Sequence, residues 1–171
     1  MAEEIKEIPL GELHPFPNHP FGVRDDEAMA QTVESIKEYG VLVPAIARPR
    51  EDGGYEIIAG HRRKHACEIA GLKTIPVIVR DIDRNTATIV MVDSNLQREN
   101  ILPSERAKAY KMKLEAIKRQ GKRHDLTSTQ PVQKLSVEQI AEDAGTSREQ
   151  IRRYIRLNEL QPELQHLVEV M

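Results

Sequence analysis

The residues with the clearest capacity for chemistry surround Gly60, at a turn between a strand-like run and a helix-like run. Residues 55–59 predict a short strand, and residues 61–70 predict a helix that Gly71 ends. A glycine at such a turn lets the backbone come close to a ligand. The N-terminus of the following helix offers unpaired N–H groups and the positive end of the helix dipole. This combination is typical of a cradle for phosphate groups.

Arg62 and Arg63 add fixed positive charge to the first turn of that helix, with forked donors that suit phosphate oxygens. The helix dipole opposes positive charge at this end, so the two arginines favour an anionic partner. A basic first turn on an ordinary solvated helix is the alternative, and these residues alone leave it open. His61 and His65 also have a metal-compatible spacing, but no third zinc ligand stands out.

Residues 136–157 have the spacing of a helix-turn-helix. Ile140 and Ala144 are apolar positions of the first helix, and Ala141 is small where the two helices would cross. Gly145 stands in the turn, where a positive φ is expected. An ordinary helical hairpin is the alternative to a DNA-binding unit.

The second helix of this pair is expected to begin at Ser147, whose hydroxyl can cap it, with Ile151, Tyr154 and Ile155 on its inner face. The residues expected to meet DNA surround the start of this helix: Thr146, Ser147, Arg148, Gln150, Arg152 and Arg153. Long basic and amide donors suit base edges and phosphates, so we expect this helix to enter the major groove.

The predicted elements place these motifs in an α+β chain, with a small α/β domain at 1–100 and an all-helical domain at 101–171. Strands are expected at 5–10, 41–48, 55–59 and 75–79, and helices at 25–39, 61–70 and 84–98. The first of these helices is capped by Asp25 and Asp26, which we interpret as a cap rather than an acid/base pair. Ser104 is expected to cap a helix that Gly121 stops, and 122–134 is expected to be a loop.

Charge is unevenly divided between the two modules, although the 171-residue chain has a net charge of only −2. Residues 1–100 hold 12 Lys and Arg against 17 Asp and Glu, whereas 101–171 hold 13 against 10. A basic second module is typical of binding to a polyanion. No apolar run approaches the roughly 20 residues that a membrane span needs. We therefore expect a cytoplasmic protein with no membrane partner, and the single Cys67 excludes an internal disulfide.

Three short motifs resemble, in order, those of ParB-type chromosome and plasmid partition proteins. The run from Gly60 to Ala66 is similar to the family's GERRxxA box, and residues 94–98 are similar to its ENxQR box. Val43 and Pro44 lie where the family has its first nucleotide-pocket strand. The predicted helix-turn-helix follows at the family's usual distance, so the resemblance covers nearly the whole chain.

The resemblance implies a ParB/sulfiredoxin-like domain that binds CTP with Mg²⁺, followed by a domain that binds double-stranded DNA at parS, an inverted repeat. CTP and Mg²⁺ would close a homodimer into a clamp that slides along DNA. The implied nucleotide-binding residues are Val43, Pro44, Gly60, His61 through its backbone, Arg62, Arg63, Arg24, Asn95 and Arg98. Asn95 would also help to hold Mg²⁺. A nucleoid-associated location, a ParA-type ATPase partner and a C-terminal dimerisation domain beyond residue 171 are further implications.

Several residues depart from the family pattern. His61 replaces the Glu of the first box, Ser94 replaces the magnesium-binding Glu of the second with Asp93 beside it, and Gly22 replaces a Gln linked to hydrolysis. The N-terminus is acidic where the family has a basic peptide for its partner ATPase. We therefore expect nucleotide binding with slow or absent hydrolysis, at most a weak CTPase activity, and assign no catalytic residue.

Two other functional classes remain open: a kinase- or nuclease-like enzyme of the wider ParB/sulfiredoxin group, and a ParB-like transcriptional regulator. An enzyme would need a nucleophile or base in the pocket. No reactive cysteine follows the glycine turn in the sulfiredoxin manner, and no carboxylate cluster suits two metals. Neither sulfiredoxin nor the related free-serine kinase would need residues 136–157. A chromosome, a plasmid or a mobile element could carry a partition system of this kind.

Overall fold

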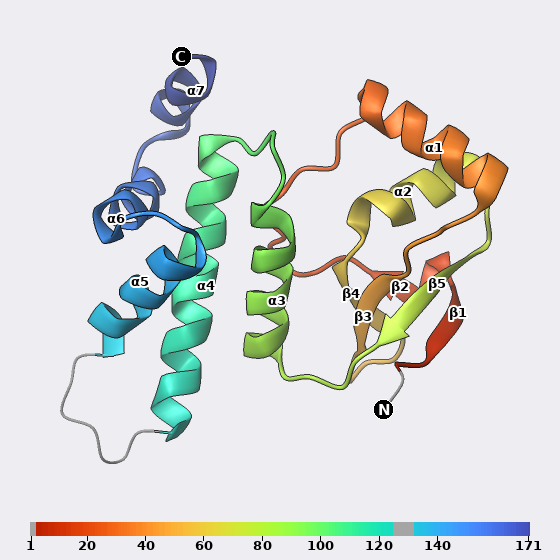
Figure 1. Ribbon diagram of the computed structural model, residues 1–171, viewed down its shortest axis with the longest axis horizontal. Coiled ribbons are helices and arrows are strands. Elements are labelled where there is room, and N and C mark those ends of the chain that lie inside the picture. The colour runs from red at the N-terminus through yellow and green to blue at the C-terminus, as the bar shows by residue number, and fades with distance from the viewer. Residues whose placement is uncertain (1–2, 125–131) are drawn as a thin grey trace. The chain divides into compact units, whose positions relative to one another are not determined.

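The computed structural model describes residues 3–124 and 132–171 (Figure 1). The chain divides into two compact units, residues 1–83 and 84–171, and each is described by itself. Residues 84–100, which we assigned to the first module, group with the second unit. The domain boundary near residue 100 stays a prediction, because compact units and evolutionary domains need not coincide.

A five-stranded mixed sheet forms the base of the first unit, in the order β1-β5-β3-β4-β2. The strands are β1 (Ile5–Pro9), β2 (Leu13–His14), β3 (Ala45–Pro49), β4 (Tyr55–Ala59) and β5 (Thr74–Val79). A 3₁₀ turn, η1 (Leu10–Glu12), joins β1 to β2. The predicted hairpin between β3 and β4 is confirmed as an antiparallel pair, whereas β3 and β5 run parallel. The expected strand at 41–48 begins only at Ala45.

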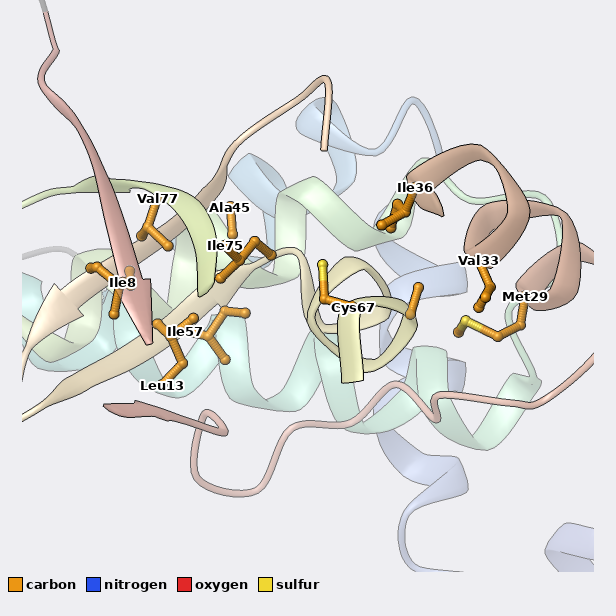
Figure 2. Close-up of a cluster of buried hydrophobic side chains, with 12 residues drawn as sticks. Ile8, Leu13, Met29, Val33, Ile36, Ala45, Ile57, Cys67, Ile75 and Val77 are labelled. Atoms are coloured by element: carbon orange, nitrogen blue, oxygen red, sulfur yellow. The ribbon is translucent and has the colours of Figure 1, made fainter. Parts of the chain in front are cut away.

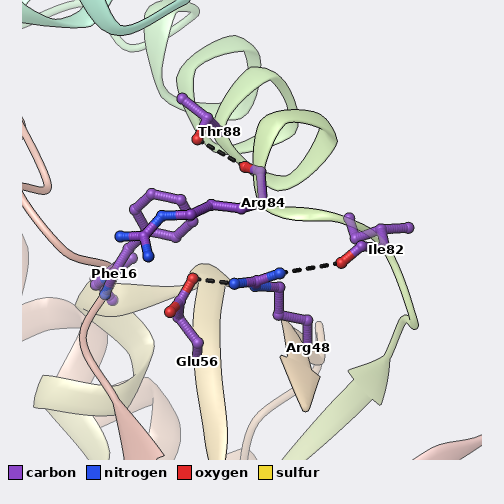
Figure 3. Close-up of polar contacts among 7 residues, drawn as sticks. Phe16, Arg48, Glu56, Ile82, Arg84 and Thr88 are labelled. Atoms are coloured by element: carbon purple, nitrogen blue, oxygen red, sulfur yellow. Dashed lines mark hydrogen bonds and ion pairs between the residues drawn. The ribbon is translucent and has the colours of Figure 1, made fainter. Parts of the chain in front are cut away.

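A buried ion pair crosses this hairpin (Figure 3). Arg48 and Glu56 are register partners on β3 and β4, and Arg48 Nε donates to Glu56 Oε1 at 3.1 Å. Arg48 Nη1 also donates to the Ile82 carbonyl oxygen at 3.2 Å. Directly opposed residues of opposite charge stabilise a strand pair. The pair therefore supports the register of the hairpin that leads into the Gly60 turn.

Two helices cover the sheet: α1 (Glu27–Tyr39) packs on α2 (His61–Ala70), and α2 contacts β3 and β5 (Figure 1). The predicted cap of α1 is confirmed for Asp26, whose carboxylate accepts the Met29 N–H at 2.8 Å. The core between helices and sheet is aliphatic (Figure 2). It consists of Ile8, Leu13, Met29, Val33, Ile36, Ala45, Ala47, Ile57, Ala66, Cys67, Ile75 and Val77. Burial raises the pKa of the Cys67 thiol, which marks it as an inert core residue.

The second unit is helical: α3 (Arg84–Leu96), α4 (Pro103–His124), α5 (Val132–Asp143), α6 (Arg148–Leu157) and α7 (Pro162–Val170). Helix α4 contacts each of the other four. The core of this unit is formed by Tyr110, Leu114, Val137, Ile140, Ala141 and Ile151. Helix α7, which begins with a proline in its first turn, was not predicted from the sequence. Within the part of the chain that the structure describes, no helix is both long and apolar enough to pass through a bilayer.

Both predicted ends of α4 are wrong. The side chain of Glu105, not Ser104, closes the first turn, because Glu105 Oε2 accepts the Leu102 N–H at 3.0 Å. The helix continues past Gly121 to His124, and Gly121 lacks the positive φ of a helix-ending glycine. A glycine inside a helix costs about 1 kcal/mol relative to alanine, which the packing of α4 on its neighbours offsets. Of the predicted loop at 122–134, residues 125–131 lie outside the described residues, and the rest is helical.

Candidate nucleotide and nucleic-acid sites

The Gly60 turn brings the backbone before α2 into close contact with β3. Gly60 has a φ of 108°, and a Cβ atom added there would lie 2.9 Å from the Ala45 Cβ and 3.2 Å from its Cα. At such a distance a side chain at position 60 would force the turn or Ala45 to shift, at a φ that favours glycine. The hydrogen-bond ladder of α2 begins with the Lys64 N–H, which donates to the Gly60 carbonyl oxygen at 2.9 Å. The amides of residues 61–63 therefore precede the ladder, in the position of an anion-binding helix terminus.

Arg63 contacts the segment that precedes β3 rather than open solvent. Its Nη1 donates to the carbonyl oxygens of Val43 and Pro44, each at 2.5 Å. Burial lowers the pKa of the Arg63 guanidinium from its usual value. The structure thus brings together three of the predicted site residues, and in this arrangement Arg63 positions the backbone of the other two.

Arg62 lies beside the acidic N-terminus of α1. Its Nη2 is 3.6 Å from Asp26 Oδ1, and one turn further along α2, His65 Nε2 is 2.6 Å from Asp25 Oδ1. The pKa of Asp26 lies below its usual value, first because the carboxylate accepts the Met29 N–H and further because of the Arg62 charge. These two links between α1 and α2 were missed, because the sequence pattern offered only a cap at Asp25 and Asp26.

The ring of His61, which stands in the place of the family's Glu, is directed toward the segment before α1. It lies 3.8 Å from the His19 ring between centroids, and its Nε2 accepts the Phe16 N–H at 3.4 Å. His65 instead contacts Asp25, so the two histidines of α2 do not converge. In residues 3–124 and 132–171 no group of three His, Cys, Asp or Glu side chains could hold a metal ion.

An open pocket of about 510 Å³ lies between α1, the segment before β3 and Arg63. Its lining mixes aliphatic side chains with hydroxyl and amide groups. The lining residues are Ala28, Gln31, Thr32, Ser35, Ile36, Gly40, Val41, Leu42, Val43 and Arg63. A pocket that offers both apolar surface and hydrogen-bonding groups can accept a small molecule that has a flat ring and polar edges.

The other predicted nucleotide-binding residues lie outside this cluster. Arg24 is exposed in the segment before α1. Asn95 and Arg98 belong to the second unit, at the end of α3 and just after it. The Asn95 side chain is buried and its Nδ2 donates to the Met91 carbonyl oxygen at 2.7 Å. Asp93, the carboxylate next to Ser94, faces Lys113 of α4.

Helices α5 and α6 are joined by a four-residue turn, 144–147, and we refer to them as the α5–α6 pair. The predicted cap at Ser147 is confirmed, since Ser147 Oγ accepts the Gln150 N–H at 3.1 Å. Gly145 has the expected positive φ of 63°. Ile140, Ala141 and Ile151 are buried between the helices. The expectation that Ala144 is an apolar position of the first helix is wrong, because α5 ends at Asp143 and Ala144 is exposed in the turn.

The predicted DNA-contacting side chains lie mainly on the exposed face of α6. Arg148, Arg152 and Arg153 are exposed, whereas Thr146 and Gln150 are half-buried. Arg148 forms an ion pair with Glu138 of α5. Arg156, which the sequence interpretation left out, is exposed on the same helix. The opposite side of α6 packs on α4, where the Tyr110 and Tyr154 rings lie 5.7 Å apart and the Arg106 guanidinium lies over Tyr154.

Comparison with known proteins assigns the class. Residues 1–96 match the family model of the ParB N-terminal domain, and the chain belongs to the ParB family. Over 166 residues it is 37% identical to stage 0 sporulation protein J of Bacillus subtilis, which covers 97% of this chain and 53% of that protein. The chain therefore spans about half the length of this relative.

Two solved structures of the C-terminally truncated chromosome-partitioning protein ParB from Caulobacter crescentus share the fold. The structure complexed with CTP-γ-S has a TM-score of 0.51 and 32% identity, and covers 96% of this chain and 84% of that chain. The structure complexed to the centromeric parS site has a TM-score of 0.59 and 30% identity, and covers 94% of this chain and 75% of that chain. The predicted fold class, a ParB/sulfiredoxin-like α/β domain followed by a helical domain, is confirmed.

Proposed function

We propose that this chain is the nucleotide- and DNA-binding part of a partition protein, which binds CTP with Mg²⁺ at the Gly60 turn and a parS-like duplex through α6. The observation that carries the proposal is the turn itself. Its glycine packs directly on Ala45 with a positive φ, and the first amides of α2, which precede the hydrogen-bond ladder of the helix, follow it beside Arg62. The similarity to the Caulobacter crescentus protein complexed with CTP-γ-S supports a nucleotide as the anion.

Each residue of the turn has a distinct part in this proposal. Gly60 and the backbone of His61 approach the triphosphate, and Arg62 exchanges Asp26 for a phosphate oxygen. Arg63 keeps Val43 and Pro44 in place at the edge of the open pocket, which takes the nucleoside. This division follows from the contacts, because Arg62 is 3.6 Å from an exposed acid whereas Arg63 donates to two backbone carbonyls.

Arg24 of the first unit, and Asn95 and Arg98 of the second, are each further proposed nucleotide-binding residues. Asn95 would offer its amide oxygen to Mg²⁺, since this ion prefers oxygen ligands. Ser94 supplies a hydroxyl where the family has a carboxylate, and Asp93 is engaged by Lys113. The charge that would hold the metal and orient water is therefore reduced, so binding without rapid hydrolysis is the favoured activity.

Isothermal titration calorimetry with CTP, ATP, GTP and UTP at millimolar Mg²⁺, with and without parS-like DNA, tests the nucleotide part of the proposal. Wild-type protein should bind CTP, and Arg62→Ala should abolish this binding. Lys73→Ala is the matched control, because it removes an exposed charge of the same sign just after α2. The proposal fails if the wild-type protein shows no affinity for any of the four nucleotides.

The α5–α6 pair serves in this proposal as the helix-turn-helix. Its second helix presents Arg148 at the N-terminal end, which such helices insert into the major groove, and Arg152 and Arg153 follow in the middle of the helix. The similarity to the Caulobacter crescentus protein complexed to parS supports this assignment. Dimeric proteins of this kind bind inverted repeats, so we further propose a homodimer on nucleoid DNA in the cytoplasm, with a ParA-type ATPase as partner.

A further inference from the structure

Lys113 of α4 is almost fully buried but carries a charged amine. Its side chain is 2% exposed, and its Nζ donates to Asp93 Oδ1 at 2.7 Å and to Asp143 Oδ2 at 2.9 Å. Burial alone would lower the pKa of Lys113, but the hydrogen bonds to both carboxylates raise it above its usual value. The amine therefore stays protonated at neutral pH and bonds to two other helices.

The two carboxylates that bind Lys113 lie at or near the ends of two different helices. Asp143 is the last residue of α5 and directly precedes the turn that leads into α6. Asp93 lies near the end of α3 and precedes Ser94 and Asn95. Lys113 is thus bonded both to the start of the α5–α6 turn and to the helix that carries Asn95.

Stability alone does not account for the cluster of Lys113, Asp93 and Asp143. A buried ion pair is weak evidence for stability, because an apolar side chain of similar volume is often at least as stabilising. The helix dipole also disfavours an acidic residue at the C-terminal end of α5, where Asp143 stands. The best-attested use of a buried polar contact is to fix the register of the elements that it joins.

The exposures of the three side chains show that either bond of Lys113 can open. Asp93 is 47% exposed and Asp143 is 46% exposed, so either carboxylate can pass into water. Lys113 cannot do so, and needs one of them as a partner. With both acids bound the cluster has one excess negative charge, and with one acid bound it is neutral. Lys113 can therefore lose its bond to α3 and remain fully paired with Asp143.

We propose that Lys113 is a positioning residue for DNA recognition, which fixes the turn before α6 through Asp143, while its separate bond to Asp93 holds the end of α3. The inference rests on the proposed DNA-binding function. A shift at the end of α5 displaces Gly145 and the Ser147 cap, and with them the first turn of α6. That turn carries Arg148, so a small displacement removes its side chain from a base edge.

The test uses the full chain with Lys113→Met, Asp143→Ala and Asp93→Ala, and Lys111→Met as the matched control, since Lys111 is exposed on the same helix. Amide hydrogen exchange at 144–147 measures the turn without DNA. Fluorescence anisotropy compares a duplex selected by the wild-type protein with a random duplex. Lys113→Met and Asp143→Ala should speed exchange at 144–147 and reduce the preference for the selected duplex about tenfold, with random-duplex affinity unchanged.

Asp93→Ala tests the bond from Lys113 to α3 separately from its bond to α5. It should speed exchange at 94–98 and leave both the turn and the duplex preference at wild-type values, because the Lys113–Asp143 pair stays neutral. Lys111→Met should change none of these quantities. If Lys113→Met fails to fold, Asp143→Ala carries the test, since Asp143 is half-exposed.

Unchanged exchange at 144–147 in both Lys113→Met and Asp143→Ala overturns the inference. It is also overturned if both duplexes lose affinity equally together with a lower melting temperature, because that is the result of a merely structural role. A wild-type protein with no duplex preference would instead contradict the proposed function. The exchange rates would then still decide whether Lys113 positions the turn.

Discussion

Arg63 and Pro44 are joined by a hydrogen bond of 2.5 Å from Arg63 Nη1 to the Pro44 carbonyl oxygen, and the same nitrogen donates to the Val43 carbonyl. One guanidinium of α2 therefore holds the segment before β3 by its backbone. This contact explains why residues 41–44 do not belong to β3, although the sequence pattern predicted a strand at 41–48. The carbonyl groups of Val43 and Pro44 face a side chain of α2 instead of a neighbouring strand.

Replacing Arg63 by methionine should lower both stability and nucleotide affinity. Two carbonyl oxygens lose a charged donor, so the free energy of unfolding in urea should fall by about 1–3 kcal/mol. Nucleotide affinity should fall with it, because the segment lines the open pocket. Arg62→Ala should abolish nucleotide binding while changing the unfolding free energy by less than about 0.5 kcal/mol. Equal stabilities of the two variants would contradict the separate roles of these arginines.

Gly60→Ala should destabilise the first unit through backbone strain and a clash with Ala45. The new Cβ would lie 2.9 Å from the Ala45 Cβ at a φ that alanine rarely adopts. We expect a loss of about 1–3 kcal/mol in the free energy of unfolding, measured by chemical denaturation. Gly11→Ala is the control, because no atom lies within 4 Å of the added Cβ and no positive φ is involved. A Gly60→Ala protein as stable as Gly11→Ala would rule out the close approach.

The Gly60 turn and the Ser147 cap could be predicted because each depends on residues that are neighbours in the sequence. A glycine before a helical pattern, or a serine at its start, specifies local geometry with little help from the rest of the chain. The hairpin and the cap at Asp26 could be predicted for the same reason. These local signals were sufficient to predict the geometry of the Gly60 turn and of the first turn of α6.

The features that the sequence did not reveal depend on contacts between distant residues. Lys113 lies 20 residues from Asp93 and 30 from Asp143, and nothing in a helical pattern marks it as buried and paired. The acceptors of Arg63 are backbone carbonyls, which every residue type provides. Gly121 failed to end α4 because tertiary packing outweighed its weak local preference.

The stability contributed by Asp26 should depend on pH in a defined direction. Its pKa in the folded chain is below the ordinary value of 3.8, so its contribution is present above that value and lost as the pH falls through the folded-state pKa. Asp26→Ala should therefore lower the melting temperature at pH 7, and the difference from wild type should shrink below pH 3.8. Asp52→Ala, at an exposed acid, is the control. A difference that is the same at pH 3 and pH 7 would exclude this origin.

Ser94→Glu should raise the rate of CTP hydrolysis. The hydroxyl of Ser94 donates to the Met91 carbonyl at 2.9 Å and carries no charge that could hold Mg²⁺. Metal charge at the transferred phosphate is a large part of the catalysis of phosphoryl transfer. Phosphate release should be slow in the wild-type protein and faster in the variant at saturating CTP and DNA. Ser94→Gln, which has the same length without the charge, should stay at the wild-type rate, and an equal increase in both variants would reject the electrostatic explanation.

Removing Arg152 and Arg153 together should distinguish base recognition from phosphate attraction. Both side chains are exposed on α6, whose inner face is anchored by the buried Ile151. A lost base contact should cost about 1–3 kcal/mol and relax one base position, whereas a lost phosphate contact should weaken binding to all sequences and lower the salt slope. Footprinting and salt titrations of each single variant and of the double variant on a selected duplex make this distinction.

The control for the double variant is Lys37→Ala combined with Arg50→Ala, which removes the same charge from the first unit. It should retain the footprint, because non-specific attraction depends on local phosphate contacts more than on the net charge of the chain. Unchanged DNA binding in the double variant of α6 would show that this helix does not recognise DNA. The α5–α6 pair would then be a packing element.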